Sequence, residues 1–204
     1  MNTHLLTRPR LPLAVATLIT LLVIGADTLN ATTVLGFDAD GLVSHADRIV
    51  HATCDRRESY RDDRGLIVTR YVFTVHESLK GDALKDGALN DGATSTIEFV
   101  QPGGEYRGVR LVIPGLSEHT VGDEMILFLS AASRHDARRR LPIGLDQGVY
   151  RVTTREDETE PKVRRRVGDL RIVNPSSALD SFPEDVGVAT FKAAVRAKVA
   201  EQKK

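Results

Sequence analysis

Leu66-Ile-Val-Thr-Arg-Tyr-Val-Phe-Thr-Val-His-Glu-Ser-Leu79 is the stretch that decides the fold of this chain. Every second residue from Ile67 to Val75 falls on one face, and the residues between them, from Val68 to His76, fall on the other. A period of two over this length predicts a β-strand rather than an amphipathic helix. Such a strand is long enough to bend around the corner of a barrel.

The rest of the chain divides into shorter segments of the same kind. Apolar runs bounded by glycine, proline or charged clusters predict further strands. Their bounds are 32–37, 48–54, 95–101, 106–113, 125–129, 143–152 and 162–173. We expect hairpin turns at 102–104 and at the acidic stretch 156–160, and loops over 58–65 and 82–93. The run 125–129 is apolar throughout, which indicates a strand covered on both faces.

Two helices are predicted to flank these strands. Asp38 is expected to cap a brief helix over 38–46. Ser181 and Glu184 have the spacing of a capping box, which predicts a second, amphipathic helix over 181–201. The apolar face of that helix is Val188, Phe191, Ala194, Val195 and Val199. The predicted fold is mainly β: a small antiparallel, OB-like barrel with a short N-terminal helix and a C-terminal amphipathic helix.

The first residues have the form of an export signal. Residues 11–26 hold no charge, and Arg8 and Arg10 stand directly before them. A basic lead, an apolar core and small residues behind it predict a secretory signal, cleaved after Ala26 or Ala31. The alternative is an uncleaved membrane anchor, since the apolar run lies between the lengths typical of the two.

Cleavage divides the chain into a signal peptide, 1–31, and a single β-barrel-type domain, 32–204. We therefore expect an exported protein, periplasmic or extracellular. Cleavage removes two basic residues and one acidic residue from the 28 of each kind, which leaves a net charge near −1. That balance gives no attraction to nucleic acid or, once the signal is removed, to an anionic membrane. Cys54 is the single cysteine, so the apolar core must hold the fold without an intramolecular disulfide.

Four segments, taken in order, resemble a family of uncharacterised exported bacterial proteins. They are Ser44–Val50, Val72–Gly81, Gln101–Gly104 and Val121–Leu129. The same order is distantly similar to the netrin-like domain of tissue inhibitors of metalloproteinases. That resemblance implies an OB-type barrel with flanking helices and a secreted protease as partner. The inhibitors act through a disulfide-held N-terminal cysteine. This chain has no such cysteine, so the resemblance assigns no inhibitory residue here.

No catalytic constellation stands out in the sequence. His51 and His76 are expected to be cross-strand neighbours, but a zinc site needs a third ligand, and no HExxH motif is present. Cys54 shares a strand face with Val50 and Ala52, which favours a buried thiol over a nucleophile activated by a histidine. We predict no catalytic residue, no metal and no cofactor.

The sequence instead favours a non-enzymatic binding module that contacts a secreted protein through its loops. The expected contact regions are 57–65, 102–108 and 130–140, with Tyr106, Arg107, Arg138, Arg139 and Arg140 as contact residues. Two rival interpretations stay open: a secreted hydrolase with a site that carries no recognisable motif, and a membrane-tethered structural protein of the envelope. Nothing in the sequence indicates an oligomeric state.

Overall fold

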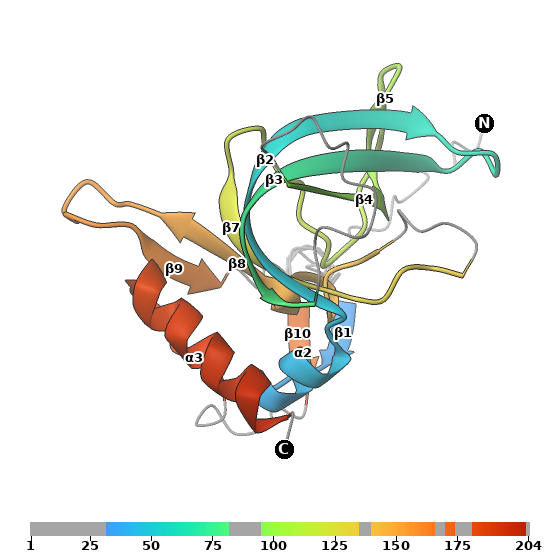
Figure 1. Cartoon of the computed structure of the whole chain (residues 1–204). Coiled ribbons are helices and arrows are strands. Elements are labelled where there is room, and N and C mark those ends of the chain that lie inside the picture. Colours follow the sequence, from blue (N-terminus) through green and yellow to red (C-terminus); the bar gives the residue numbers. More distant parts are fainter. Residues whose placement is uncertain (1–31, 82–94, 135–139, 166–169, 174–180, 203–204) are drawn as a thin grey trace, which may run out of the picture. The chain divides into compact units, whose positions relative to one another are not determined.

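Two strands of 14 residues each, β2 (Arg48–Arg61) and β3 (Ile67–Lys80), form the longest antiparallel pair of the fold. They are seen in a computed structural model that describes residues 32–81, 95–134, 140–165, 170–173 and 181–202. The register between the two strands shifts at three places along β2. Such bulges bend a strand, and Figure 1 shows both strands strongly curved.

The strand predicted over 66–79 matches β3 to within one residue at each end, but β2 is longer than the sequence indicated. We expected a strand over 48–54 and a loop over 58–65, whereas β2 continues to Arg61. Charged side chains do not interrupt the strand, because each residue from 56 to 61 pairs with a residue of β3. The turn is confined to its tip, where the carboxylate of Asp62 accepts hydrogen bonds from the amides of Arg64 and Leu66.

This pair belongs to a seven-stranded antiparallel sheet of order β11-β9-β8-β7-β2-β3-β4. The remaining strands are β4 (Thr96–Pro102), β7 (Glu124–Leu129), β8 (Val149–Thr153), β9 (Lys162–Arg165) and β11 (Val186–Gly187). The predicted hairpin of β8 and β9 is confirmed, with Val152 opposite Val163. Within the described residues no ladder joins β4 to β11. The fold is therefore mainly β as predicted, but a closed barrel is not found.

Residues 106–113 do not pair with 95–101, which corrects the predicted hairpin. Instead β5 (Gly104–Tyr106) pairs with β6 (Val109–Leu111), and β4 pairs with β3. The tip residues Arg107 and Gly108 both have positive φ, the conformation of a type I′ turn. A side chain on Gly104 would collide with the hydroxyls of Ser59 and Thr69, so only glycine lets β5 pass this close to the central strands.

The N-terminal elements follow the sequence prediction. β1 (Thr32–Leu35) pairs in parallel with β10 (Leu170–Val173) as a separate two-stranded sheet. The single strand predicted over 162–173 is therefore wrong, since only β9 pairs with β8. The helix α2 (Ala39–His45) begins after Asp38, whose carboxylate accepts a hydrogen bond from the amide of Gly41 at 2.6 Å. Its buried side chains include Leu42 and Val43. The signal segment 1–31 and its two expected cleavage positions lie outside the described residues.

The C-terminal helix, α3 (Val188–Glu201), begins seven residues later than predicted. The preceding segment cannot continue the helix because Asp185 has a φ of 59° and β11 pairs with β9. The supposed capping box of Ser181 and Glu184 is thus no cap. Phe182 is instead buried against Phe191 of α3, with ring centroids 5.5 Å apart.

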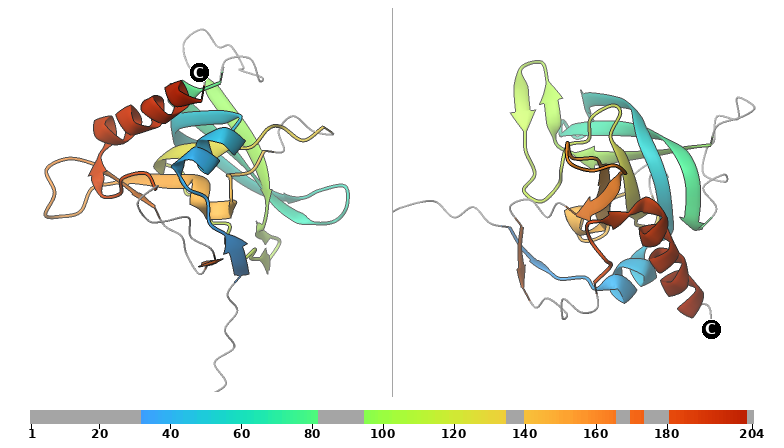
Figure 2. Two further views of the ribbon diagram at one scale, coloured as in Figure 1. Left: turned by 90° about the horizontal axis from the view of Figure 1, so that it is seen from below. Right: turned by 90° about the vertical axis from the view of Figure 1, so that its left-hand side faces the viewer.

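Side chains on both faces of the sheet are buried in separate clusters. Both helices pack on one face (Figures 1 and 2). Phe128, Tyr150 and Phe191 belong to the buried cluster on that face. The other face buries an aromatic group around Tyr71, Phe73 and Phe99. The strand β7 contributes alternate residues to the two clusters, which confirms that it is covered on both faces. No helix in the described part of the chain has the length and apolarity needed to cross a membrane.

Candidate functional site

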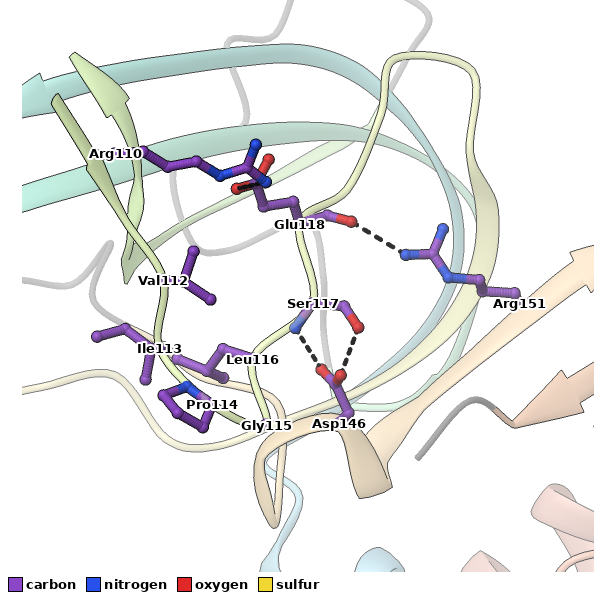
Figure 3. A pocket seen from close by; sticks show the side chains of 10 residues that line it. All are labelled: Arg110, Val112, Ile113, Pro114, Gly115, Leu116, Ser117, Glu118, Asp146 and Arg151. Carbon is purple, nitrogen blue, oxygen red and sulfur yellow. Dashed lines mark hydrogen bonds and ion pairs between the residues drawn. The ribbon is translucent and has the colours of Figure 1, made fainter. Parts of the chain in front are cut away.

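A pocket of about 360 Å³ opens between the loop 110–118, the short 3₁₀ helix η1 (Leu145–Gly148) and strand β8 (Figure 3). This volume lies within the range typical of ligand pockets, roughly 300–1,000 Å³. Its lining consists of Arg110, Val112, Ile113, Pro114, Gly115, Leu116, Ser117, Glu118, Asp146 and Arg151. The sequence predicted a strand over 143–152. Residues 145–148 form η1 instead, because Gly144 and Leu145 have left-handed backbone conformations, which begin a turn.

Asp146 fixes the loop to η1. One carboxylate oxygen accepts the amide of Ser117 at 2.8 Å, and the other accepts the hydroxyl of the same residue. The amide of Asp146 in turn donates to the carbonyl of Gly115 at 3.0 Å. Because only 3% of Asp146 is exposed, these bonds satisfy a charge that burial would otherwise disfavour. The pocket wall is therefore held in place before any ligand arrives.

The other charges at the pocket are matched within the protein. The two carboxylate oxygens of Glu118 accept from Arg57 at 3.1 Å and from Arg110 at 3.2 Å. Arg151 pairs with Asp123 at 2.6 Å and also donates to the carbonyl of Glu118 at 3.1 Å. Arg57 and Arg110 thus share Glu118, Arg151 pairs with Asp123, and Asp146 bonds to Ser117, so the set holds three arginines and three carboxylates. The described groups leave no excess of either sign at this site.

An aliphatic wall faces these charges. It includes Val112, of which 63% is exposed, together with Ile113 and Leu116. Behind it, Gln101 is 3% exposed and donates to the carbonyl of Ser117 at 2.9 Å, while its own side-chain oxygen has no partner. Gln101 lines a second void of about 20 Å³, which shares Val112 and Leu116 with the pocket.

Two of the predicted contact residues lie at the tip of the β5–β6 hairpin. The guanidinium of Arg107 stands over the ring of Tyr106, 5.2 Å from its centroid. Arg107 is exposed and Tyr106 is half-buried. The loop 110–118 that forms the pocket overlaps the end of this hairpin, so the prediction for 102–108 came close to the pocket without including it.

Of the three neighbouring arginines predicted as contact residues, Arg140 is not at the surface. Arg138 and Arg139 lie outside the described residues. Arg140 is only 4% exposed and donates to the carboxylate of Asp47 at 2.7 Å and to the carbonyl of Ser130 at 3.0 Å. Its role is to join two segments that are distant in sequence. Three adjacent arginines suggested solvation, but one of them is a buried cross-link.

The two strand histidines are neighbours as predicted, with ring centroids 5.1 Å apart. His51 Nε2 bonds to Glu124 at 2.7 Å, and His76 Nε2 bonds to Thr53 at 2.7 Å. His51 is buried rather than half-exposed, and this burial lowers its pKa against the opposing effect of Glu124. Within the described ranges, no three metal-ligating side chains gather into a cluster that could hold an ion.

Cys54 is buried, as its strand face predicted. Burial raises the pKa of its thiol to about 11, and the carboxylates of Asp123 and Asp55 add to that shift. A thiol in this state is protonated at neutral pH, so it is a poor nucleophile.

His119 is the buried polar residue that the sequence did not reveal. It is fully buried among the rings of Tyr71, Phe73 and Phe99, at centroid distances of 4.9, 5.8 and 5.9 Å. Neither ring nitrogen has a hydrogen-bond partner. Burial lowers its pKa to about 3, helped by the charge of Arg151, so the ring is neutral. No period or motif marks it, because it follows a polar loop.

No protein-family model and no curated protein matches this chain.

Proposed function

We propose that the protein is an exported, non-enzymatic binding module that contacts another secreted protein through the loops around this pocket. In this proposal the curved sheet is an OB-like frame that presents the β5–β6 hairpin and the loop 110–118. A secreted protease is the partner that the resemblance to netrin-like domains suggests.

The observation that carries the proposal is the mutual pairing of the polar groups at the pocket. Glu118, Asp146 and Arg151 are each bonded to a neighbouring protein group. A general base or acid works best with a pKa near the operating pH and within reach of the substrate. His119, the histidine nearest in sequence, is instead neutral and enclosed by aromatic rings. Satisfied polar groups on a fixed wall meet the requirement of a binding interface for a preorganised polar rim without a buried unpaired charge.

The rim of the pocket has the composition of a contact surface. Tyr106 and Arg107 form a preorganised pair at the hairpin tip. Tyrosine and arginine are, with tryptophan, the side chains enriched at the energetic centres of interfaces. Val109 and Val112 expose 51% and 63% of their surface close by. The rim therefore offers aromatic, cationic and aliphatic contacts on one continuous segment.

The test is partner capture by the mature chain from the medium in which it is exported. Wild type is compared with the Tyr106→Ser, Arg107→Ser double variant and with Arg155→Ser, an exposed arginine on the opposite hairpin. Capture should be weakened by the double variant and unchanged by Arg155→Ser. Equal capture by all three would contradict the proposal.

A hydrolase screen of the same purified chain addresses the enzymatic rival. Ser117 is the serine at the pocket, and its hydroxyl donates to Asp146. Turnover that is lost in Ser117→Ala would replace the binding proposal with a hydrolase. Cell fractionation and the mass of the exported chain address the membrane-tethered rival, since that reading requires residues 11–26 to be retained.

A further inference from the structure

We infer that the pocket receives an uncharged aliphatic side chain from an extended segment of a partner polypeptide. This inference rests on the proposed function, because it names the chemistry of the partner at the same site. Three observations lead to it: the balance of charge at the pocket, the exposed aliphatic wall, and the unpaired oxygen of Gln101.

The charge balance decides against a charged ligand group. Arg57 and Arg110 are both occupied by Glu118, and Arg151 is occupied by Asp123. A carboxylate entering here would have to compete with Glu118 or Asp123 for these arginines, and an ammonium would have to compete with the arginines for the carboxylates. Desolvating an unmatched charge is costly, so electrostatics disfavours such partners. A neutral group enters without disturbing the network.

The aliphatic wall supplies the attraction. Val112 and Leu116 line the pocket, and Val112 keeps most of its surface exposed. Covering such a surface with another aliphatic side chain removes apolar area from water on both partners. The volume of about 360 Å³ has room for one such side chain and part of the backbone that carries it. The adjoining hairpin, with exposed Val109, gives that backbone a surface to continue along.

Gln101 adds the polar contact that fixes orientation. Its side-chain oxygen is a buried acceptor without a partner, and leaving such an atom unpaired is unfavourable. The void of about 20 Å³ beside it is large enough for a single water molecule, which needs roughly 10–15 Å³. The void and the pocket share Val112, Leu116 and Glu118 as lining residues, so in this inference a water in the void links the oxygen to a peptide N–H of the partner in the pocket. The site therefore prefers a ligand that combines an aliphatic side chain with a backbone donor.

The test titrates small probes into the full mature chain labelled with ¹⁵N. The probes are N-acetyl-leucine N-methylamide, its lysine and glutamate analogues, and N-acetyl-leucine methyl ester, which lacks the C-terminal N–H. We expect saturable shifts of the amides of 112–118 with the leucine amide, and binding about tenfold weaker for both charged analogues. The ester should bind several-fold more weakly than the amide.

Two valines give matched variants. Val112→Ser changes the pocket wall, whereas Val121→Ser changes a valine that is 56% exposed and does not line the pocket. The leucine probe should lose about tenfold in affinity with Val112→Ser and nothing with Val121→Ser. Absence of saturable shifts, equal binding of the charged analogues, or equal effects of the two variants would overturn the inference.

Failure here is distinguishable from failure of the proposed function. Partner capture that survives Val112→Ser would overturn the pocket chemistry and leave the binding module intact. Probe binding with the expected preferences, but no captured partner, would overturn the binding of a secreted protein and leave the chemistry of the pocket standing.

Discussion

The side chain of Gln147 holds the backbone of Phe37 across 110 residues of sequence. Its oxygen accepts the amide of Phe37 at 2.9 Å, and its nitrogen donates to the carbonyl of Leu35 at 2.9 Å. Gln147 is fully buried in η1, the same turn that carries Asp146 into the pocket. One short turn thus fastens both the segment before α2 and the loop 110–118 to the sheet.

Gln147→Ala should lower the free energy of unfolding by about 2 kcal/mol, because it leaves the groups on Leu35 and Phe37 without partners. Hydrogen exchange at the Phe37 amide should accelerate at the same time. Urea unfolding and exchange measured by NMR check both effects. Gln202→Ala, at an exposed glutamine that donates to Asp40, serves as the control and should change little. Unchanged exchange at Phe37 would contradict the role of Gln147.

Arg140→Ser should destabilise the fold by about 1–3 kcal/mol, because it breaks the ion pair with Asp47 and leaves the carbonyl of Ser130 without this donor. The cost stays below that of a fully enclosed pair, since the side chain of Asp47 is 38% exposed and also meets Arg48. Arg107→Ser, at an exposed arginine, should stay within about 0.5 kcal/mol. The unfolding midpoints of both variants in heat and in urea are the measurement. Similar midpoints would contradict the role of Arg140 as a buried link between Asp47 and Ser130.

His119 should make the fold less stable in acid. Its pKa in the folded chain is about 3, against an ordinary value of 6.5, so below pH 6.5 the unfolded chain takes up a proton that the folded chain refuses. His119 therefore leaves the free energy of unfolding unchanged above pH 6.5. Between pH 6.5 and 3 it lowers that free energy, by up to about 1.4 kcal/mol per pH unit as the pH drops. Urea midpoints measured over this range should fall less steeply in His119→Leu than in wild type. Parallel curves would show that another group causes the loss.

Phe191→Ala should cost about 3–5 kcal/mol, because the ring is fully buried between Tyr150 and Phe182 and its removal leaves a cavity. Thr190→Ala changes the preceding, exposed position of the same helix and should leave stability nearly unaltered. Chemical denaturation followed by circular dichroism measures both. An unchanged midpoint for Phe191→Ala would mean that α3 does not stabilise the sheet.

The sequence by itself determined the elements whose pattern is local. Period two marked β3, an unbroken apolar run marked β7, and Asp38 marked the start of α2, because each signal depends only on residues a few positions apart. The burial of Cys54 and the meeting of His51 with His76 followed from the same alternation. The glycines at 103, 104 and 108 indicated a hairpin turn without showing which strands pair: the turn is at 107–108, and Gly104 lies in β5.

The tertiary structure alone decided what depends on distant partners. Charged residues 56–61 stay in a strand because β3 pairs with them, and 181–187 leave the helix because β11 pairs with β9. Arg140 is buried because Asp47, far away in sequence, neutralises it. The pocket likewise arises from η1 meeting the loop 110–118. A hydrogen bond or ion pair between such segments needs only one suitable side chain on each of them. It therefore produces no repeating pattern that could be recognised in the sequence.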